Sequence, residues 1–201
     1  MEGRVAEARH LAESVLDGSG GRLQHVRRVG VLAEQLTVAL SLGPQVAEAA
    51  WLHDVGYGGS VVITGFHSLD GATWLAARGW APTVVSLVAF HSGAAVEAEQ
   101  RGLIEQLAGF PLPEAEDLDA LDFCDLTTGP DGSSVGVEER ISEILGRYPA
   151  DDPVHRAVLL SRAELVASVQ RVQDRLASAD TDRAAVGQAM TDALTHGRVH
   201  G

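Results

Sequence analysis

Histidine and aspartate residues recur on the apolar faces of several expected helices. His25, His53, His91 and Asp125 each share a face with aliphatic residues, and Asp54 directly follows His53. A buried carboxylate is too costly to leave ionised without a cation or strong hydrogen-bond donors. The chain contains no lysine, so a metal ion or an arginine must supply the positive charge. A single histidine of this kind is more often a hydrogen-bonded core residue, but the whole set favours metal chemistry.

The donor types limit which metals are expected. Imidazole nitrogens and carboxylate oxygens without a thiolate suit Mn, Fe, Co, Ni, Mg or Zn in a catalytic site with open coordination positions. His53 and Asp54 close an apolar run, where a loosened last helical turn lets both side chains reach one centre or lets Asp54 bridge two. The sequence therefore predicts a cofactor of one or two divalent metal ions.

The elements that position these residues are expected to be helices almost throughout. Apolar residues recur at spacings of three and four, and period-2 alternation is nearly absent. The pattern predicts an all-α fold with a short extended piece at 61–63, a further helix in the polar tail 178–201, and helices at 3–17, 22–42, 44–55, 67–78, 82–92, 95–107, 114–127, 135–147 and 153–177. A boundary near residue 150 divides a metal-binding helical domain, 1–150, from a C-terminal helical extension, 151–201, that packs on it.

Composition excludes several classes of function. The 201 residues carry a formal net charge of −13, which argues against binding of a nucleic-acid polymer or an anionic membrane. The single Cys124 excludes an intrachain disulfide and a cysteine-based zinc site. The charged N-terminus does not resemble a signal peptide, and no apolar run is long enough to span a membrane. A soluble cytoplasmic protein is expected, and its oligomeric state is left open.

The ordered pattern His25, His53-Asp54 and Asp125 resembles that of the HD superfamily of metal-dependent phosphohydrolases. The resemblance covers roughly residues 20–130, and three local contexts carry it: Leu-Gln-His-Val-Arg-Arg, Ala-Trp-Leu-His-Asp-Val-Gly and Leu-Asp-Phe-Cys-Asp-Leu-Thr. It implies an HD-domain-like helical bundle and a metal held by these four residues. His67 and His91 are similar to the ligands that bind a second metal in two-metal members of the family.

The chain departs from two specialised branches of that family. The branch that acts on cyclic di-GMP carries a His-His pair where this chain has His91-Ser92, and its Gly-Tyr-Pro signature is absent. The acidic pair that follows the dyad in alarmone (ppGpp) hydrolases is replaced here by residues 55–59. Neither specialised activity is therefore expected.

The resemblance implies a phosphohydrolase that uses a metal-activated water on a small phosphorylated substrate, such as a nucleotide. Asp54 is expected to bind metal and to accept a proton, and His91 to belong to the same catalytic group. Arg28, with Arg27 as a second candidate, is expected to stabilise the negative charge that develops during transfer. Two alternatives stay open: a di-iron oxygenase of HD type that acts on a small molecule, and a non-catalytic, metal-binding regulatory module.

Several polar residues receive weaker assignments. Ser92, Thr127 and Thr128 are expected either to donate hydrogen bonds at the mouth of the site or to cap helix ends. Asp122 lies one turn before Asp125 and is a candidate to contact the metal ligands without binding the metal itself. Glu97, in contrast, is expected on a solvated face.

Overall fold

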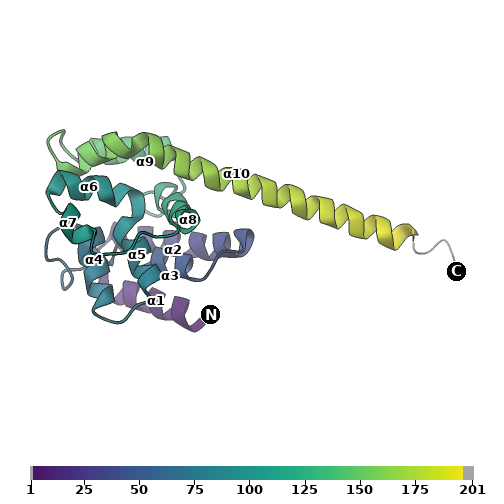
Figure 1. Ribbon diagram of the computed structural model, residues 1–201, viewed down its shortest axis with the longest axis horizontal. Helices are drawn as coiled ribbons and strands as arrows, with labels where there is room; N and C mark the ends of the chain where they lie inside the picture. Colours follow the sequence, from purple (N-terminus) through teal and green to yellow (C-terminus); the bar gives the residue numbers. More distant parts are fainter. Residues whose placement is uncertain (1, 197–201) are drawn as a thin grey trace.

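The all-α class is confirmed (Figure 1). The computed structural model describes the backbone of residues 2–196 and the side chains of residues 3–181, and within this part of the chain it contains no β-strand. The α-helices are α1 (Glu2–Val15), α2 (Gly21–Leu40), α3 (Gln45–Leu52), α4 (His67–Ala76), α5 (Pro82–Phe90), α6 (Ala94–Arg101), α7 (Ile104–Leu107), α8 (Ala115–Leu126), α9 (Val137–Arg147) and α10 (Pro153–His196). Two short 3₁₀ turns, η1 (Val55–Tyr57) and η2 (His91–Gly93), follow α3 and α5.

Three expectations about these elements are wrong. The helix expected at 95–107 is divided, because Gly102 adopts a left-handed conformation with φ 69° that ends α6. Residues 61–63 form turns and bends rather than an extended piece. The helix that begins at Pro153 does not stop near 177 but continues to His196 and absorbs the separate helix expected in the tail.

The short helix α3 lies at the centre of the bundle. All seven residues from Val46 to Leu52 are buried, and α3 packs against α1, α2, α5 and α8. A helix of eight residues has little stability of its own, so these surrounding contacts must hold it. Because α3 ends inside the bundle, His53 and Asp54, which follow it directly, lie in the interior.

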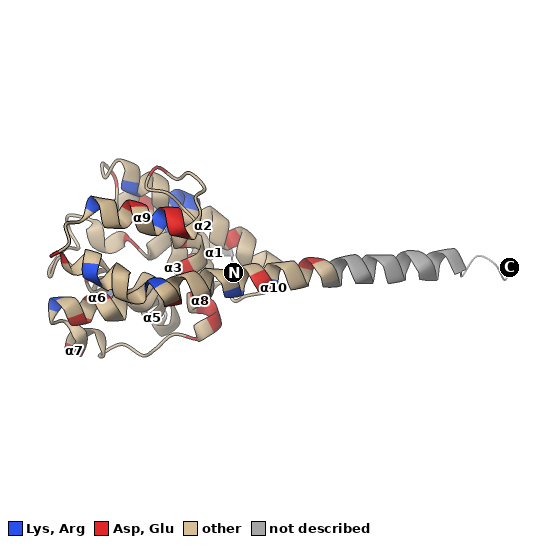
Figure 2. Cartoon of the chain, turned by 90° about the horizontal axis from the view of Figure 1, so that it is seen from above, with Lys and Arg blue, Asp and Glu red and all other residues tan. Residues whose placement is uncertain are grey.

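The long helix α10 crosses the outside of the bundle and then runs beyond it (Figures 1 and 2). Its first half packs on α6, α8 and α9, where it buries Ala157, Leu165, Val169 and Val172. Leu165 and Val169 share a small apolar cluster with Ile141 of α9. The C-terminal extension therefore closes one side of the bundle, while the domain boundary at residue 150 stays a prediction. Among the described residues, no helix has both the length and the apolar character that a membrane span requires.

Candidate metal centre

The structure brings all the predicted metal ligands to one place in the interior. Each comes from a different helix or from the residues that follow one. His25 lies in the first half of α2, the dyad directly follows α3, and Asp125 lies near the end of α8. Two further ligands stand at helix ends, since His67 is the first residue of α4 and His91 directly follows α5.

One group of donor atoms is formed by His25, His53, Asp54 and Asp125. The Nε2 atoms of His25 and His53 are 3.3 Å apart. Asp54 Oδ2 lies 3.4 Å from His53 Nε2 and 3.9 Å from His25 Nε2. Asp125 Oδ1 lies 3.0 Å from His25 Nε2 and 4.0 Å from His53 Nε2. Two nitrogens and two carboxylate oxygens thus surround one small volume.

A second group lies on the other side of Asp54. Its Oδ1 atom is 3.5 Å from His67 Nε2, which in turn is 3.2 Å from His91 Nε2. The donor atoms of Asp54, His67 and His91 all lie within 4.8 Å of one another, as do those of His25, His53 and Asp54. One oxygen of Asp54 therefore faces each group, as a carboxylate that bridges two metal positions would.

Backbone carbonyls fix the orientation of three imidazole rings. Nδ1 of His25, His53 and His91 lies 3.1, 2.8 and 2.8 Å from the carbonyl oxygens of Gly129, Ala50 and Val88. A carbonyl oxygen only accepts, so each Nδ1 carries the hydrogen, and a neutral ring oriented in this way would present its Nε2 lone pair to the interior. This is the usual outer support of metal-binding histidines.

The inward donors lie close enough together to share a positive centre. Neutral His25 and His53 rings oriented in this way would face each other with Nε2 lone pairs across 3.3 Å and repel one another. His67 Nε2 and His91 Nε2 are similarly close, at 3.2 Å. Donor atoms about 2.0–2.2 Å from one metal ion lie roughly 3–3.5 Å apart, which agrees with most of these separations. The buried histidines and aspartates could therefore hold a metal ion, and the two groups around Asp54 offer two positions.

Arg22 pairs directly with Asp54 of this centre and was not predicted from the sequence. Its Nη1 donates to Asp54 Oδ2 at 2.6 Å, and its guanidinium lies 4.1 Å from the centre of the Tyr57 ring. Burial alone would raise the pKa of the Asp54 carboxyl, but Arg22 and the neighbouring histidines together outweigh burial and hold that pKa well below its ordinary value. Asp54 is therefore ionised, as a carboxylate that could hold a metal ion must be.

Neither of the two arginines chosen from the sequence lines the cavity beside the centre. Arg27 is exposed and its Nε donates to Glu13 at 2.9 Å, and Arg28 is not among the residues that line the cavity beside the centre. Arg22 and Arg28 are both three positions from His25, so helical spacing alone does not distinguish them. The distinction comes from which end of α2 faces Asp54.

Tyr57 and Gly56 position His67. The Tyr57 ring stacks on the His67 ring with 4.4 Å between ring centres. A Cβ atom on Gly56 would lie 1.9 Å from the His67 carbonyl oxygen, so only glycine allows η1 to approach α4 this closely. The Val-Gly-Tyr sequence after the dyad thus supports the second group of ligands.

Ser92 connects the turn after α5 to the acidic residues of α8. Its Oγ donates to Asp125 Oδ2 at 2.5 Å, and its backbone N–H donates to Asp122 Oδ1 at 2.6 Å. Ser92 has φ 50°, which is a left-handed conformation that non-glycine residues rarely adopt. Residues in such conformations are found more often at functional sites. The hydroxyls of Thr127 and Thr128 instead donate to carbonyls four residues earlier in α8, so they do not donate into the site.

A cavity of about 80 Å³ opens beside the centre and is lined by both ligands and cations. Asp54, His67, His91 and Asp125 contribute to its wall together with Arg22, Arg140, Arg147, Tyr57 and Tyr148. Glu97 also lines it and accepts from Arg101 Nε at 2.6 Å, so the expected solvated position of Glu97 is wrong. Metal ligands and arginines thus meet in a single small chamber.

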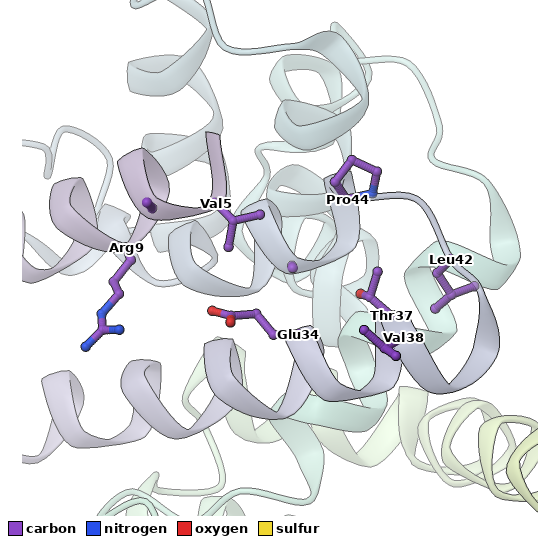
Figure 3. Close-up of a pocket in the computed structure, with 9 residues that line it drawn as sticks. Val5, Arg9, Glu34, Thr37, Val38, Leu42 and Pro44 are labelled. Atoms are coloured by element: carbon purple, nitrogen blue, oxygen red, sulfur yellow. The ribbon is translucent and has the colours of Figure 1, made fainter. Parts of the chain in front are cut away.

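A larger hollow lies between α1, α2 and the start of α3, away from the centre (Figure 3). It measures about 460 Å³ and is mostly apolar, with Val5, Val38 and Leu42 on its wall and Arg9 at one end. No histidine or aspartate lines it. The cavity beside Asp54 is therefore the one where chemistry is expected.

The metal-free protein is expected to lose stability in mild acid. Burial lowers the pKa of His53 to about 4 and that of His67 to about 3, whereas an unfolded histidine titrates near pH 6.5. Between pH 6.5 and about pH 4, the unfolded state therefore binds more protons than the folded state. The free energy of unfolding falls as the pH drops through this range, by about 1.4 kcal/mol per pH unit for each of the two histidines. Thermal melts of chelator-treated protein at pH 7.5 and pH 5 measure the effect.

Bound metal requires neutral histidines, so metal-loaded protein should keep its melting temperature to lower pH than the metal-free protein does. Equal melting temperatures at pH 7.5 and pH 5 without metal would contradict the burial of neutral histidines.

Comparisons of the chain with protein-family models, with curated proteins and with solved structures find no match. The resemblance to the HD superfamily therefore rests on the order, spacing and contexts of the ligands. The geometry adds that these residues, which are far apart in the sequence, share one buried centre.

Proposed function

We propose that this protein is a metal-dependent phosphohydrolase of the HD superfamily that acts on a small phosphorylated substrate. The observation that carries the proposal is the position of Asp54, which stands between two groups of imidazole donors and also lines the adjacent cavity. A bridging carboxylate between two metal ions is suited to displacement at phosphorus, where charge develops on both the attacking and the leaving oxygen.

The chain's own residues supply binding, orientation and charge. Asp54, His25, His53 and Asp125 would hold one metal, and Asp54, His67 and His91 would hold the other. When bound, the metals supply Lewis acidity and lower the pKa of water. Arg22 neutralises charge at the edge of the cavity, 2.6 Å from Asp54.

Two supporting contacts keep the ligands in place for this chemistry. Ser92 fixes Asp125 through its hydroxyl, and Tyr57 fixes the His67 ring by stacking. Ligands held by such neighbours keep their geometry when substrate enters, which is what efficient transfer requires.

A di-iron oxygenase is the second candidate. The same bridging arrangement favours it, because Asp54 and three or more histidines would equally serve two irons. Consumption of oxygen by iron-loaded protein in the presence of small-molecule substrates, without release of phosphate from esters, would favour this candidate over hydrolysis.

The function is tested by assaying metal-loaded protein for phosphate release from p-nitrophenyl phosphate and from nucleoside monophosphates. We expect turnover that a chelator abolishes and that Mn, Co or another divalent ion restores. His53→Ala should lower kcat by more than about 100-fold, since even outer supports of metal ligands contribute roughly 10–100-fold. His10→Ala, at an exposed histidine on α1, is the matched control and should retain full activity. Turnover that survives in His53→Ala would refute the assignment.

A further inference from the structure

Arg140 is a buried cation with an unpartnered donor. Its residue surface is 5% exposed, and Nη1 donates to Glu143 Oε2 at 2.5 Å. Its Nε is also buried, and it finds no hydrogen-bond partner among the described residues. A buried, charged donor without an acceptor is costly, so a missing anionic partner is the natural explanation. Arg140 lines the cavity beside the metal centre, where such a partner has room.

A second arginine lies on the same side of that cavity. Arg140 and Arg147 are two turns apart on α9, and both contribute to the cavity wall. Glu143 stands between them and accepts from both, including from Arg147 Nε at 3.0 Å. The shared carboxylate holds the two guanidinium groups in a fixed relation, as a preformed anion site requires.

Among the described residues, no carboxylate that lines the cavity accepts a hydrogen bond from Arg140 or Arg147, although the charge of Arg140 helps to lower the pKa of Asp125. Asp54 pairs with Arg22 at 2.6 Å, and Glu97 pairs with Arg101 at 2.6 Å. Asp125 accepts from Ser92 and lies 3.0 Å from His25 Nε2. With a metal ion offsetting the charge of Asp54 and Asp125, the arginines that line the cavity would outnumber the one remaining carboxylate in its lining, Glu97. Glu143 offsets only one of the two charges of Arg140 and Arg147.

We propose that Arg140, supported by Arg147, binds the terminal phosphoryl group of a phosphate monoester and selects monoesters over diesters. The proposal rests on the proposed function. A monoester carries a charge of about −2 near neutral pH, and a diester carries one charge fewer. The cavity of about 80 Å³ admits a small group rather than a whole ligand, for which sites of roughly 300–1,000 Å³ are usual. The phosphoryl group lies inside, and the rest of the substrate extends outwards.

The test measures binding of inorganic phosphate to metal-loaded protein by calorimetry, together with the kcat/KM ratio for p-nitrophenyl phosphate against bis(p-nitrophenyl) phosphate. Arg140→Met should weaken phosphate binding roughly 10- to 100-fold, as expected for loss of hydrogen bonds between charged groups. It should reduce the monoester-to-diester ratio by a similar factor and leave the metal content unchanged. Arg140→Lys keeps the charge but loses Nε, and should weaken binding roughly 10-fold or less.

The matched control is Arg162→Met, because Arg162 is an exposed arginine of α10 that pairs with Glu138 on α9. It should change neither phosphate binding nor the substrate ratio. If Arg140→Met does not fold, Arg140→Lys and Arg147→Met carry the same test, and both should weaken phosphate binding.

The two proposals fail differently. Phosphate binding and substrate preference that survive in all of the Arg140 and Arg147 variants would overturn the role of Arg140, even in an active phosphohydrolase. Failure of the intact, metal-loaded protein to bind phosphate would also overturn it. Phosphate binding that depends on Arg140, in a protein that hydrolyses no ester, would uphold the anion site and refute the proposed function.

Discussion

Replacement of Asp54 by asparagine will remove both metal ions and abolish phosphate release. Asp54 Oδ2 faces His53 at 3.4 Å and Oδ1 faces His67 at 3.5 Å, so a single carboxylate serves both groups. Asparagine has nearly the same size, but its neutral amide offers only one oxygen and no charge to offset two cations. We expect metal content near background and a loss in kcat of more than about 100-fold, since even outer supports contribute roughly 10–100-fold.

Metal analysis and phosphate-release kinetics on the purified Asp54→Asn variant measure this prediction. Asp119→Asn is the matched control, because Asp119 lies on α8, pairs with Arg171 and does not line the cavity. It should retain both metals and full activity. An Asp54→Asn variant with the metal content of the natural protein would show that Asp54 is not the shared ligand.

Replacement of His91 by alanine should separate the two metal positions. His91 Nε2 lies 3.2 Å from His67 Nε2, while His25, His53, Asp54 and Asp125 form the other group without it. We therefore expect His91→Ala to retain one metal ion per chain. We also expect it to lose most of the phosphate release, because the second ion no longer offsets charge on the transferred group.

The number of metal ions that each chain of the His91→Ala variant binds decides between one metal position and two. Retention of two ions would exclude His91 as a ligand. Loss of both ions would show that the groups are not independent and that the centre assembles only as a unit. His10→Ala, measured beside it, controls for the loss of an imidazole as such.

The inward position of the candidate ligands could be predicted from the sequence because burial leaves a periodic signal. His25 shares its helical face with buried Val29 and Leu36, and Asp125 follows buried Leu121 by one turn. Inward direction can be read from such spacing, and the HD resemblance supplied the order. The spacing did not supply distances, because the closeness of helices far apart in the sequence depends on packing around α3.

The arginines of the cavity were missed for a physical reason. A charged residue on a helix is solvated by default, and Arg140 is surrounded in sequence by Glu138, Glu139 and Glu143. One signal was present: Arg140 directly precedes buried Ile141 and lies one turn before Ile144. Arg22 left no such signal, because the position equally spaced on the other side of His25 is also an arginine.

Loop and helix ends were predicted less well than helix centres. Gly102 ends α6 because it adopts a left-handed conformation. Glycine can adopt this conformation but can also continue a helix, so the sequence was compatible with one unbroken helix over 95–107. The residues beyond 177 continue α10 instead of forming a separate helix, because no glycine or proline interrupts the chain there before Gly187. Tertiary packing and local breakers, rather than periodicity, decide such boundaries.

The most direct test of the metal centre is elemental analysis of the intact protein, purified without chelator and then dialysed against each divalent ion in turn. The two groups of donors around Asp54 predict close to two divalent ions per chain, removed by a chelator and restored by readdition. A protein that carries no metal after purification and binds none on readdition would contradict the centre, and the proposed hydrolysis with it.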